Sequence, residues 1–396
     1  MRKKKTRHIL YIIFKYFEAD PRPQREVAAL LDNGYHVDVI CLHPIYTDRK
    51  IIYNKKINYY TIKLNKQRGT KISYIFQYSI FFFFTLFQGL RLFLHNRYDL
   101  IQIFVMPELL VLSCIFQKFL GTKILMDWED PSLEVYQAIY KDKKKFLLNI
   151  IRFIEKIAVK ASDKIITPNE GFRQAFILRG YQPDKIDIVM NLPDKRIFNK
   201  KYNETYLSHQ KTHYILYNGS IIHRHGLDIC IEALSEVVKE KPDICLYIFA
   251  PKDMTDYYLQ CKLLSKKLNV DKNIEWCKPV GIYKMPKFIK NASMIVIPNR
   301  DTPFTRINLP TRIMEGGILK TPVVVSRLPG IKHYFNSTEV YFFEPDNPKD
   351  MAEKIITLLN SKEKVKTLVE RNFTKCKSLE WEKSYLDIVE RLCNQE

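Results

Sequence analysis

Short apolar runs alternate with longer amphipathic segments along the first half of the chain. The runs have the length of strands, and between them apolar residues recur at the three- and four-residue spacing of helices. This repeated order predicts a parallel sheet covered by helices on both faces. The expected strands are residues 9–14, 37–42, 100–104, 123–126, 164–167 and 186–190, and helices are expected over residues 22–32 and 149–161 among others.

The same order begins again after a polar stretch near residues 191–212. A chain of 396 residues is longer than one hydrophobic core usually fills, which is about 250–300 residues. We therefore expect an α/β protein with two Rossmann-like, doubly wound domains, residues 1–195 and 196–375. The strands expected in the second half are residues 214–218, 246–249, 274–276, 294–297 and 322–326, and the helices are residues 227–239, 257–268, 312–318, 351–360 and 382–392.

Residues 74–94 form an unusually apolar segment with a single charge, Arg91, and a run of four phenylalanines. About 20 apolar residues are enough to cross a bilayer, but polar residues interrupt this segment and a strand follows at once. A spanning helix is therefore the least favoured interpretation. The other two are a buried helix and a helix lying on the bilayer with its aromatic face inserted. Nearby basic residues favour the latter: Lys63, Lys66, Arg68 and Lys71.

The net charge of +21 calls for an anionic partner, either nucleic acid, an acidic membrane or phosphorylated substrates. No nucleic-acid-binding motif appears, and basic residues are spread through both halves, which argues against nucleic acid. The first apolar run is too short for a signal peptide and has no cleavage site. The eight cysteines form no C-x-x-C pair, as expected of buried thiols in a reducing compartment. We expect a cytoplasmic protein, peripheral on the inner face of the cell membrane.

Residues 294–326 hold the most informative pattern, in which a strand ends in a polar loop, a helix begins near Pro310 and Thr311, and a second strand follows. Proline suits the entry to a helix. A helix N-terminus beside the carboxyl ends of strands is a ready site for a diphosphate. Glu315, one turn into the helix, is placed to accept hydrogen bonds from ribose hydroxyls.

This pattern resembles the donor site of glycosyltransferase family 4, whose members are retaining enzymes of the GT-B fold, with two Rossmann-like domains facing an interdomain cleft. Their motif holds two glutamates separated by seven residues. The second falls on Glu315, which the resemblance assigns to the donor ribose. The first falls on Ile307, so Asn308 or Asp301 is expected to replace it. The family's lysine corresponds to Arg312. Asn299, in the loop before the helix, is expected to bind the donor as well.

Residues 216–228 resemble a second family motif, a strand followed by a glycine-rich loop that ends in a basic residue and glycine. In the family, basic side chains of this loop clamp the donor diphosphate, which stabilises the leaving group as its charge develops. The resemblance implies that Gly219 and Ser220 form the start of the loop. Arg224 is expected to contact the phosphates, with His225 assisting.

The opening loop and first helix of the family are matched by residues 20–37, where Arg22 and Arg25 are expected to bind an anionic acceptor. A family strand that ends in aspartate-x-histidine-acid is matched by Asp127, Glu129 and Asp130, with Glu129 in place of the histidine. The resemblance implies that these three carboxylates form the catalytic group, with Glu129 acting as a general base or stabilising an oxocarbenium-like centre. The alternative for Asp130 is capping of the next helix.

The resemblance covers nearly the whole chain, and it implies that residues 376–396 form a helix that crosses back to the first domain. The expected activity is hexosyl or N-acetylhexosaminyl transfer from a nucleotide sugar to a lipid-linked, phosphorylated or cell-surface glycan, in polysaccharide biosynthesis. No two aspartates are separated by one residue, so we expect no metal site and no cofactor besides the donor. A non-catalytic nucleotide-sugar-binding protein and a GT-B sugar epimerase are the alternatives.

Overall fold

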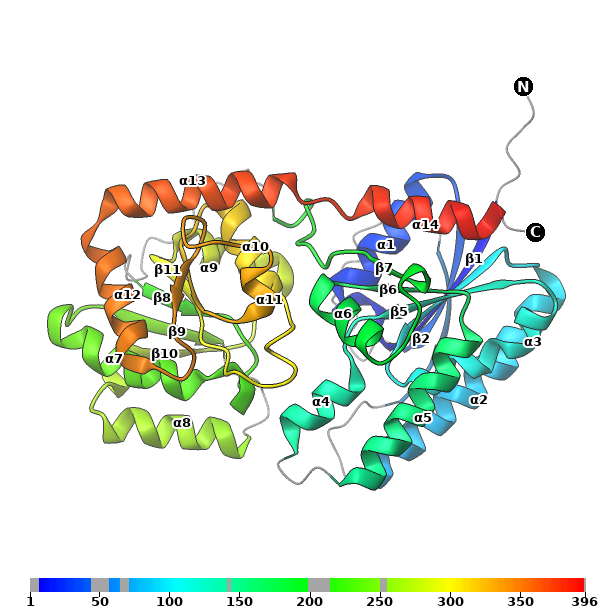
Figure 1. Ribbon diagram of the computed structural model, residues 1–396, viewed down its shortest axis with the longest axis horizontal. Helices are drawn as coiled ribbons and strands as arrows, with labels where there is room; N and C mark the ends of the chain where they lie inside the picture. Colours follow the sequence, from blue (N-terminus) through cyan, green and yellow to red (C-terminus); the bar gives the residue numbers. More distant parts are fainter. Residues whose placement is uncertain are drawn as a thin grey trace. The chain divides into compact units, whose positions relative to one another are not determined.

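The computed structural model describes residues 7–43, 57–64, 71–140, 144–198, 214–249 and 255–394. The chain divides into two compact units (Figure 1). Unit 1 comprises Met1–Asn191 and Glu380–Glu396, and unit 2 comprises Leu192–Leu379. The sequence places these boundaries at residues 195 and 375, against 191 and 379 in the structure. Most of the expected polar connection, residues 199–212, lies outside the described residues.

Unit 1 contains a seven-stranded sheet in the order β3-β2-β1-β4-β5-β6-β7. Every neighbouring pair is parallel, as the strand–helix alternation predicts. The strands are β1 (His8–Tyr16), β2 (His36–Leu42), β3 (Asn58–Ile62), β4 (Leu100–Val105), β5 (Lys123–Trp128), β6 (Lys164–Thr167) and β7 (Ile186–Ile188). The sequence does not predict β3, because this half-exposed edge strand lacks the apolar run of a buried one.

Two layers of helices cover this sheet, with α1 and α14 on one face and α2, α3 and α5 on the other (Figure 1). The last helix is tied to the middle of the sheet, because the Tyr385 hydroxyl donates a 2.6 Å hydrogen bond to Oε1 of Gln102 in β4. The helices of unit 1 are α1 (Pro21–Asp32), α2 (Lys71–His95), α3 (Ile115–Phe119), α4 (Ser132–Ile139), α5 (Lys145–Ala161), α6 (Glu170–Leu178) and α14 (Glu382–Asn394).

The apolar segment at residues 74–94 lies within α2. Phe81 and Leu92 of this helix are buried, and the Phe81 ring packs 4.9 Å from the ring of Phe14 in β1. In the described part of the chain, one helix, Ser73–His95, is long and apolar enough to cross a membrane, and only 28% of its apolar window is buried. Of the basic residues expected beside it, Lys66, Arg68 and the side chain of Lys71 fall outside the described residues.

Unit 2 contains a six-stranded sheet in the order β10-β9-β8-β11-β12-β13, also parallel throughout. Its strands are β8 (Tyr214–Tyr217), β9 (Cys245–Phe249), β10 (Ile274–Cys277), β11 (Met294–Ile297), β12 (Val323–Ser326) and β13 (Tyr341–Phe343). Its helices are α7 (Leu227–Glu240), α8 (Asp256–Lys267), α9 (Met285–Asn291), α10 (Thr311–Leu319), α11 (Pro329–Lys332), α12 (Pro348–Asn360) and α13 (Lys362–Ser378). The eight cysteines are free thiols.

Candidate active site

Two loops meet at the carboxyl ends of β8 and β11, which are neighbours in the sheet of unit 2. The first ends at Gly226, whose φ of 65° lies in the left-handed region that favours glycine. A Cβ at this position would lie 1.9 Å from the carbonyl oxygen of Pro298 in the second loop. The Arg300 amide also donates a 3.0 Å hydrogen bond to the Arg224 carbonyl oxygen. The two loops are therefore held in one fixed arrangement, at the edge where ligands of parallel sheets bind.

The Arg300 side chain fastens the same two loops, a role that the sequence does not reveal. Its Nε donates a 3.2 Å hydrogen bond to the carbonyl oxygen of His223. Its Nη atoms form ion pairs with Asp228, in the first turn of α7, and with Asp346. Because Nε and both Nη atoms of Arg300 already have partners, the side chain is not free to bind a ligand. We therefore assign Arg300 to positioning the loops.

Glu315 projects from the first turns of α10 toward the end of β8. Its Oε2 accepts a 3.2 Å hydrogen bond from Nδ2 of Asn218, and Oε1 lies 3.5 Å from the Thr311 hydroxyl, which donates to it. Burial raises the pKa of Glu315 to about 7, although Arg312, Thr311 and Asn218 oppose the shift. When the pKa of a carboxyl group lies near neutral pH, hydrogen bonds from the hydroxyls of a ligand favour its ionised form.

Arg312 lies against the glycine that follows β8. A Cβ at Gly219 would be 2.4 Å from Nη1 of Arg312, so a larger residue there would displace the guanidinium. Nη2 of Arg312 lies 3.5 Å from Oδ1 of Asn299. Burial lowers the pKa of Arg312, against the influence of Tyr217 and Glu315. The fold thus brings together Gly219, Asn299, Arg312 and Glu315, all predicted donor-binding residues.

Three buried polar atoms at this place have no hydrogen-bond partner among the described residues: Oδ1 of Asn218, Nδ2 of Asn299 and Nη1 of Arg312. Buried polar atoms are nearly always paired in folded proteins, because leaving one unpaired costs about 1–3 kcal/mol. Two donors and one acceptor beside an ionisable carboxylate match a polar ligand that carries both hydroxyls and anionic oxygens.

His225 lies between two cationic side chains. Its Nδ1 is 3.1 Å from the carbonyl oxygen of Ser220, and since a carbonyl only accepts, the ring proton belongs on Nδ1. Burial and the charges of Arg312 and Arg224 lower the pKa of His225 to about 3, so the ring is neutral. Arg224, half-buried, also has its guanidinium 5.0 Å from the ring of Phe304.

The two predicted substitutes for the missing first glutamate differ in their surroundings. Asp301 is exposed, and its carboxylate pairs with Arg306 at 2.8 Å. Asn308 lies in the loop before α10, where its carbonyl oxygen would be 2.9 Å from a Cβ at Gly330. Since Arg306 already engages Asp301, Asn308 is the better placed of the two to meet a ligand.

In unit 1, Glu129 forms a second polar cluster at the carboxyl ends of β1 and β5. Its Oε2 is 3.0 Å from Nζ of Lys15, which also pairs with Asp20 at 2.6 Å. Oε1 accepts a 3.4 Å hydrogen bond from Nδ2 of Asn191. Burial raises the pKa of Glu129 to about 7, although Lys15 opposes the shift. Lys15 is not part of the site predicted from the sequence. A lysine at the end of a buried strand could have indicated it, because the carboxyl ends of parallel strands are where ligands bind.

Asp127 is fully buried, and its carboxylate accepts two hydrogen bonds, 3.0 and 2.9 Å, from Nε and Nη2 of Arg22. Nη1 of Arg22 donates to the carbonyl oxygen of Val189 at 2.9 Å. Because each group is already fully engaged inside unit 1, the structure favours a structural role for this pair over the predicted catalysis by Asp127 and acceptor binding by Arg22.

Arg25 is equally buried. Its Nη2 donates a 2.8 Å hydrogen bond to the carbonyl oxygen of Met190, and its guanidinium stacks 4.5 Å from the ring of Trp381. These contacts again favour a structural role over the predicted contact with an acceptor. The alternative expected for Asp130 is capping of the next helix, and in the structure Pro131 occupies the N-cap position of α4.

Comparisons with known proteins agree with this geometry. Residues 199–374, which include Glu315 and the loop before Gly226, match the family model described as glycosyl transferases group 1. The chain is 25% identical over 241 residues to an uncharacterized glycosyltransferase of Methanocaldococcus jannaschii, covering 60% of this chain and 61% of that one. The chain therefore spans about three fifths of the length of the curated relative it matches.

Solved structures match over the whole chain. A glycosyltransferase from Rickettsia africae has a TM-score of 0.72 at 14% identity, covering 99% of this chain and 100% of that one. Sucrose-phosphate synthase from Thermosynechococcus elongatus has a TM-score of 0.76 at 14% identity, covering 97% and 98%. The protein has the GT-B fold. HepE of Anabaena, in complex with UDP and glucose, shares this GT-B fold, with a TM-score of 0.70 at 14% identity over 98% and 100% of the two chains.

Proposed function

We propose that the protein is a retaining glycosyltransferase that moves a hexosyl or N-acetylhexosaminyl group from a nucleotide sugar. The acceptor is a lipid-linked or phosphorylated cell-surface glycan, and the reaction takes place at the cytoplasmic face of the membrane. One observation carries the proposal. Within the segment that matches the glycosyltransferase model, Glu315 lies beside Asn218, Asn299 and Arg312, and each of these three has one buried polar atom without a partner among the described residues.

Each group has a role toward the donor. Ionised Glu315 accepts hydrogen bonds from the ribose hydroxyls, while Asn218 holds the carboxylate in place. Arg312, Arg224 and the N-terminus of α10 neutralise the diphosphate, both in the bound donor and as it leaves with the bonding electron pair. The HepE structure contains UDP, so a uridine nucleotide is the first donor to test.

His225 gains a function once a diphosphate is bound. Its pKa is low because burial and two nearby arginines disfavour the imidazolium. A diphosphate brings negative charge to the same place and therefore raises the pKa of His225. The ring can then take a proton on Nε2 and donate a hydrogen bond to the leaving phosphate.

Glu129 is the proposed catalytic carboxylate of unit 1. With its pKa raised to about 7 by burial, it is partly ionised at neutral pH and can take a proton or stabilise positive charge at the reacting carbon. Lys15, 3.0 Å away, holds it in position. Asp127 supports this group from the core rather than reacting itself.

We further propose that the reaction needs no metal ion, because arginines and a helix N-terminus are placed to neutralise the donor phosphates. Among the residues that the structure describes, no group of three or more histidine, cysteine, aspartate or glutamate side chains could hold a metal. Turnover should therefore be unchanged by a chelator, and a loss of turnover that Mg²⁺ restores would contradict this part of the proposal.

Thermal-shift screening of the whole protein against nucleotide sugars tests the donor assignment, because a ligand that binds the folded state raises the melting temperature. We expect a uridine diphosphate sugar to raise it and Glu315→Gln to abolish the shift. Glu353→Gln, at an exposed position of α12 in the same unit, is the matched control and should keep it. A shift that survives Glu315→Gln would refute the site.

Product analysis separates the alternatives. A transferase releases nucleoside diphosphate, slowly to water and faster once an acceptor is added, and Glu129→Gln should remove both reactions. A protein that only binds the donor releases no free nucleotide. An epimerase returns an isomeric sugar, which chromatography of the products distinguishes from the starting donor.

A further inference from the structure

The helix α2 distributes its polar and apolar residues differently from a helix on the surface of a soluble protein. The side that faces the protein carries the buried residues Gln77, Thr85 and Gly89. Such helices normally bury their apolar stripe and expose their polar one. The exposed stripe of α2, at helical spacing, is apolar instead: Phe76 (66% exposed), Phe83 (54%), Phe87 (68%) and Leu94 (84%).

The polar residues on the inner side remain poorly satisfied. Oε1 of Gln77 and Oγ1 of Thr85 are buried and have no hydrogen-bond partner among the described residues. Gly89 packs against Gln117 of α3, whose Nε2 would lie 3.1 Å from a Cβ at the glycine. Exposing phenylalanines is unfavourable in water, and contact of the outer side with an apolar phase removes this cost.

The helix is nevertheless part of unit 1 rather than a detachable span. Phe81 and Leu92 are buried on its inner side, and Phe81 packs on Phe14 of the inner strand β1. Pulling α2 away to cross a bilayer would expose this part of the core to water. A helix that keeps its inner side on the sheet and offers its outer side to a membrane satisfies both contacts.

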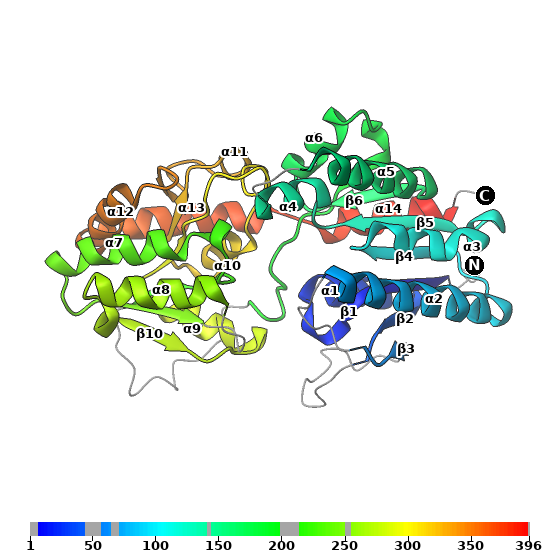
Figure 2. The same cartoon turned by 90° about the horizontal axis from the view of Figure 1, so that it is seen from below.

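The neighbouring helices continue the apolar surface. Figure 2 shows α2, α3 and α5 on the same side of the sheet of unit 1. We call the exposed apolar side chains of these three helices, together with Leu120 directly after α3, the apolar face. Besides those of α2, it includes six residues: Phe116, Phe119, Leu120, Phe146, Ile150 and Phe153. Exposed apolar patches on a soluble protein rarely exceed a few hundred Å², and larger ones mark interaction sites.

Charge decides what covers this face. The sequences of α2, α3 and α5 contain one acidic residue, Glu155, and it is buried and paired with Arg179 at 2.9 Å. Basic residues stand beside the phenylalanines of α5 at helical spacing and are exposed: Lys145, Arg152, Lys156 and Lys160. A second copy of the chain would bring two basic surfaces together, whereas an anionic lipid surface offers both acyl chains and phosphates.

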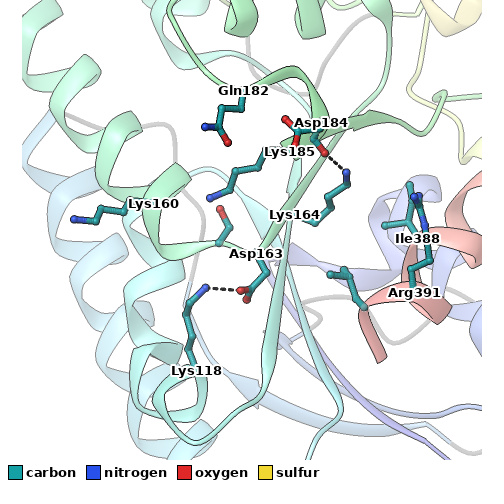
Figure 3. A pocket seen from close by; sticks show the side chains of 11 residues that line it. Lys118, Lys160, Asp163, Lys164, Gln182, Asp184, Lys185, Ile388 and Arg391 are labelled. Carbon is teal, nitrogen blue, oxygen red and sulfur yellow. Dashed lines mark hydrogen bonds and ion pairs between the residues drawn. The ribbon is translucent and has the colours of Figure 1, made fainter. Parts of the chain in front are cut away.

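A basic cavity of about 450 Å³ lies at the ends of α3 and α5 and is lined in part by Lys118 and Lys160 (Figure 3). Lys118 pairs with Asp163 at 2.8 Å. Lys185, just before β7, also lines the cavity, and burial together with the charge of Lys118 lowers its pKa. The cavity lies at the amino ends of β6 and β7, whereas Glu129 follows the carboxyl end of β5. An anionic headgroup at this place would relieve the repulsion between Lys118 and Lys185.

We propose that the apolar face of unit 1 inserts into the interface of an anionic bilayer. Its phenylalanines lie among the upper acyl chains, and the basic residues of α5 and of the adjoining cavity contact lipid phosphates. The inference rests on the proposed action at a membrane, but it is independent of the donor chemistry. It assigns the membrane contact to a particular surface and makes α2 a helix that lies in the interface.

Vesicle co-sedimentation of the whole protein tests this surface. We expect binding to vesicles of phosphatidylcholine with 30% phosphatidylglycerol, and at least tenfold weaker partitioning for the triple variant Phe76→Ser, Phe83→Ser, Phe87→Ser. The matched control is Leu259→Ser, Leu263→Ser on α8 of unit 2, where these leucines are 44% and 67% exposed. The control should bind as the unchanged protein does. Because all the replaced side chains are exposed, the variants should remain folded, which melting temperatures check.

A second variant separates charge from apolar insertion. Arg152→Gln, Lys156→Gln, Lys160→Gln should weaken binding at low salt and flatten its salt dependence, because fewer phosphates are contacted. The matched basic control is Lys266→Gln, Lys267→Gln at the end of α8. Equal effects of the two basic variants would overturn the assignment of lipid phosphates to α5.

Two further outcomes would overturn the proposal. One is undiminished vesicle binding by the triple phenylalanine variant. The other is a dimer in solution that this variant converts to a monomer, with no vesicle binding by either form, which would make a second copy the occupant of the face. The thermal shift with nucleotide sugars is read separately. A failure of membrane docking leaves that shift intact, whereas Glu315→Gln removes it and leaves vesicle binding unchanged.

Discussion

Asn218 and Glu315 are 97 residues apart in the sequence, and the structure joins their side chains by a 3.2 Å hydrogen bond from Nδ2 to Oε2. One residue follows β8 and the other lies in α10, so the contact links the two motifs of unit 2. The sequence singles out Glu315 but not Asn218. The pair explains how the carboxylate is oriented before a donor arrives.

Asn218→Ala should weaken binding of the donor about tenfold, because a lost hydrogen bond to a carboxylate is worth about 1.5 kcal/mol. Asn218→Asp should weaken it further, since a second carboxylate beside Glu315 raises the pKa of Glu315. Isothermal titration with the donor that gives the largest thermal shift measures both variants. Equal affinities for the unchanged protein and the two variants would show that Asn218 does not orient Glu315.

The raised pKa of Glu315 predicts a rise in donor affinity as the pH increases through about 7, because the ionised form accepts the ribose hydroxyls. Affinity measured from pH 5.5 to 8.5 should level off above pH 8. Glu315→Gln should bind weakly at every pH, without this dependence. A pH profile that is the same for both proteins would mean that another group titrates.

The same carboxyl group should make stability fall with pH. Its folded-state pKa, about 7, lies above the unfolded value of about 4.3, so its contribution is complete below pH 4 and is lost as the pH rises through 7. Compared with the unchanged protein, Glu315→Gln should therefore melt at a higher temperature at pH 8 and at a similar one at pH 4. A lower melting temperature of Glu315→Gln at pH 8 would exclude burial as the cause of the raised pKa of Glu315.

Gly226→Ala should destabilise the protein by about 2 kcal/mol or more, because it combines a left-handed backbone with a clash against the Pro298 carbonyl oxygen. The two loops of the donor site should separate, and the donor-induced thermal shift should be lost. Gly281→Ala is the control, since no atom lies within 4 Å of a Cβ at that position. Urea unfolding measures both variants. Equal stabilities would show that the loops adjust without cost.

Asp127→Ala should lower the free energy of unfolding by about 1.5–3 kcal/mol, because it removes two hydrogen bonds to the buried Arg22 guanidinium and leaves Glu26, 3.2 Å from Nε, as its remaining acidic partner. Glu129→Gln, two residues away, should change stability little and remove turnover. Urea unfolding and a radiolabelled-sugar assay distinguish the two roles. If Asp127→Ala is as stable as the unchanged protein yet inactive, the carboxylate is catalytic as the sequence first suggests.

Most strands and helices follow from local patterns, which is why the sequence predicts most of the elements. A buried parallel strand reads as an apolar run whatever surrounds it. The strands missed, β3 and β13, are edge strands of five and three residues. The half-exposed β3 has no continuous apolar run that distinguishes it from a loop, whereas β13 is a mostly buried apolar run of only three residues, shorter than the strands that the pattern identifies.

The candidate site shows the same difference between what local sequence patterns determine and what the tertiary structure determines. By itself, the sequence determined which residues have suitable chemistry, Glu315 and Arg312 among them, because motif spacing places them at strand ends and helix starts. Only the tertiary structure decided which charges pair with each other. Arg22 and Asp127, 105 residues apart, satisfy one another in the core. It also decided that the phenylalanines of α2 face outward. Periodicity gives a helix two sides, but which side is covered depends on what packs against it.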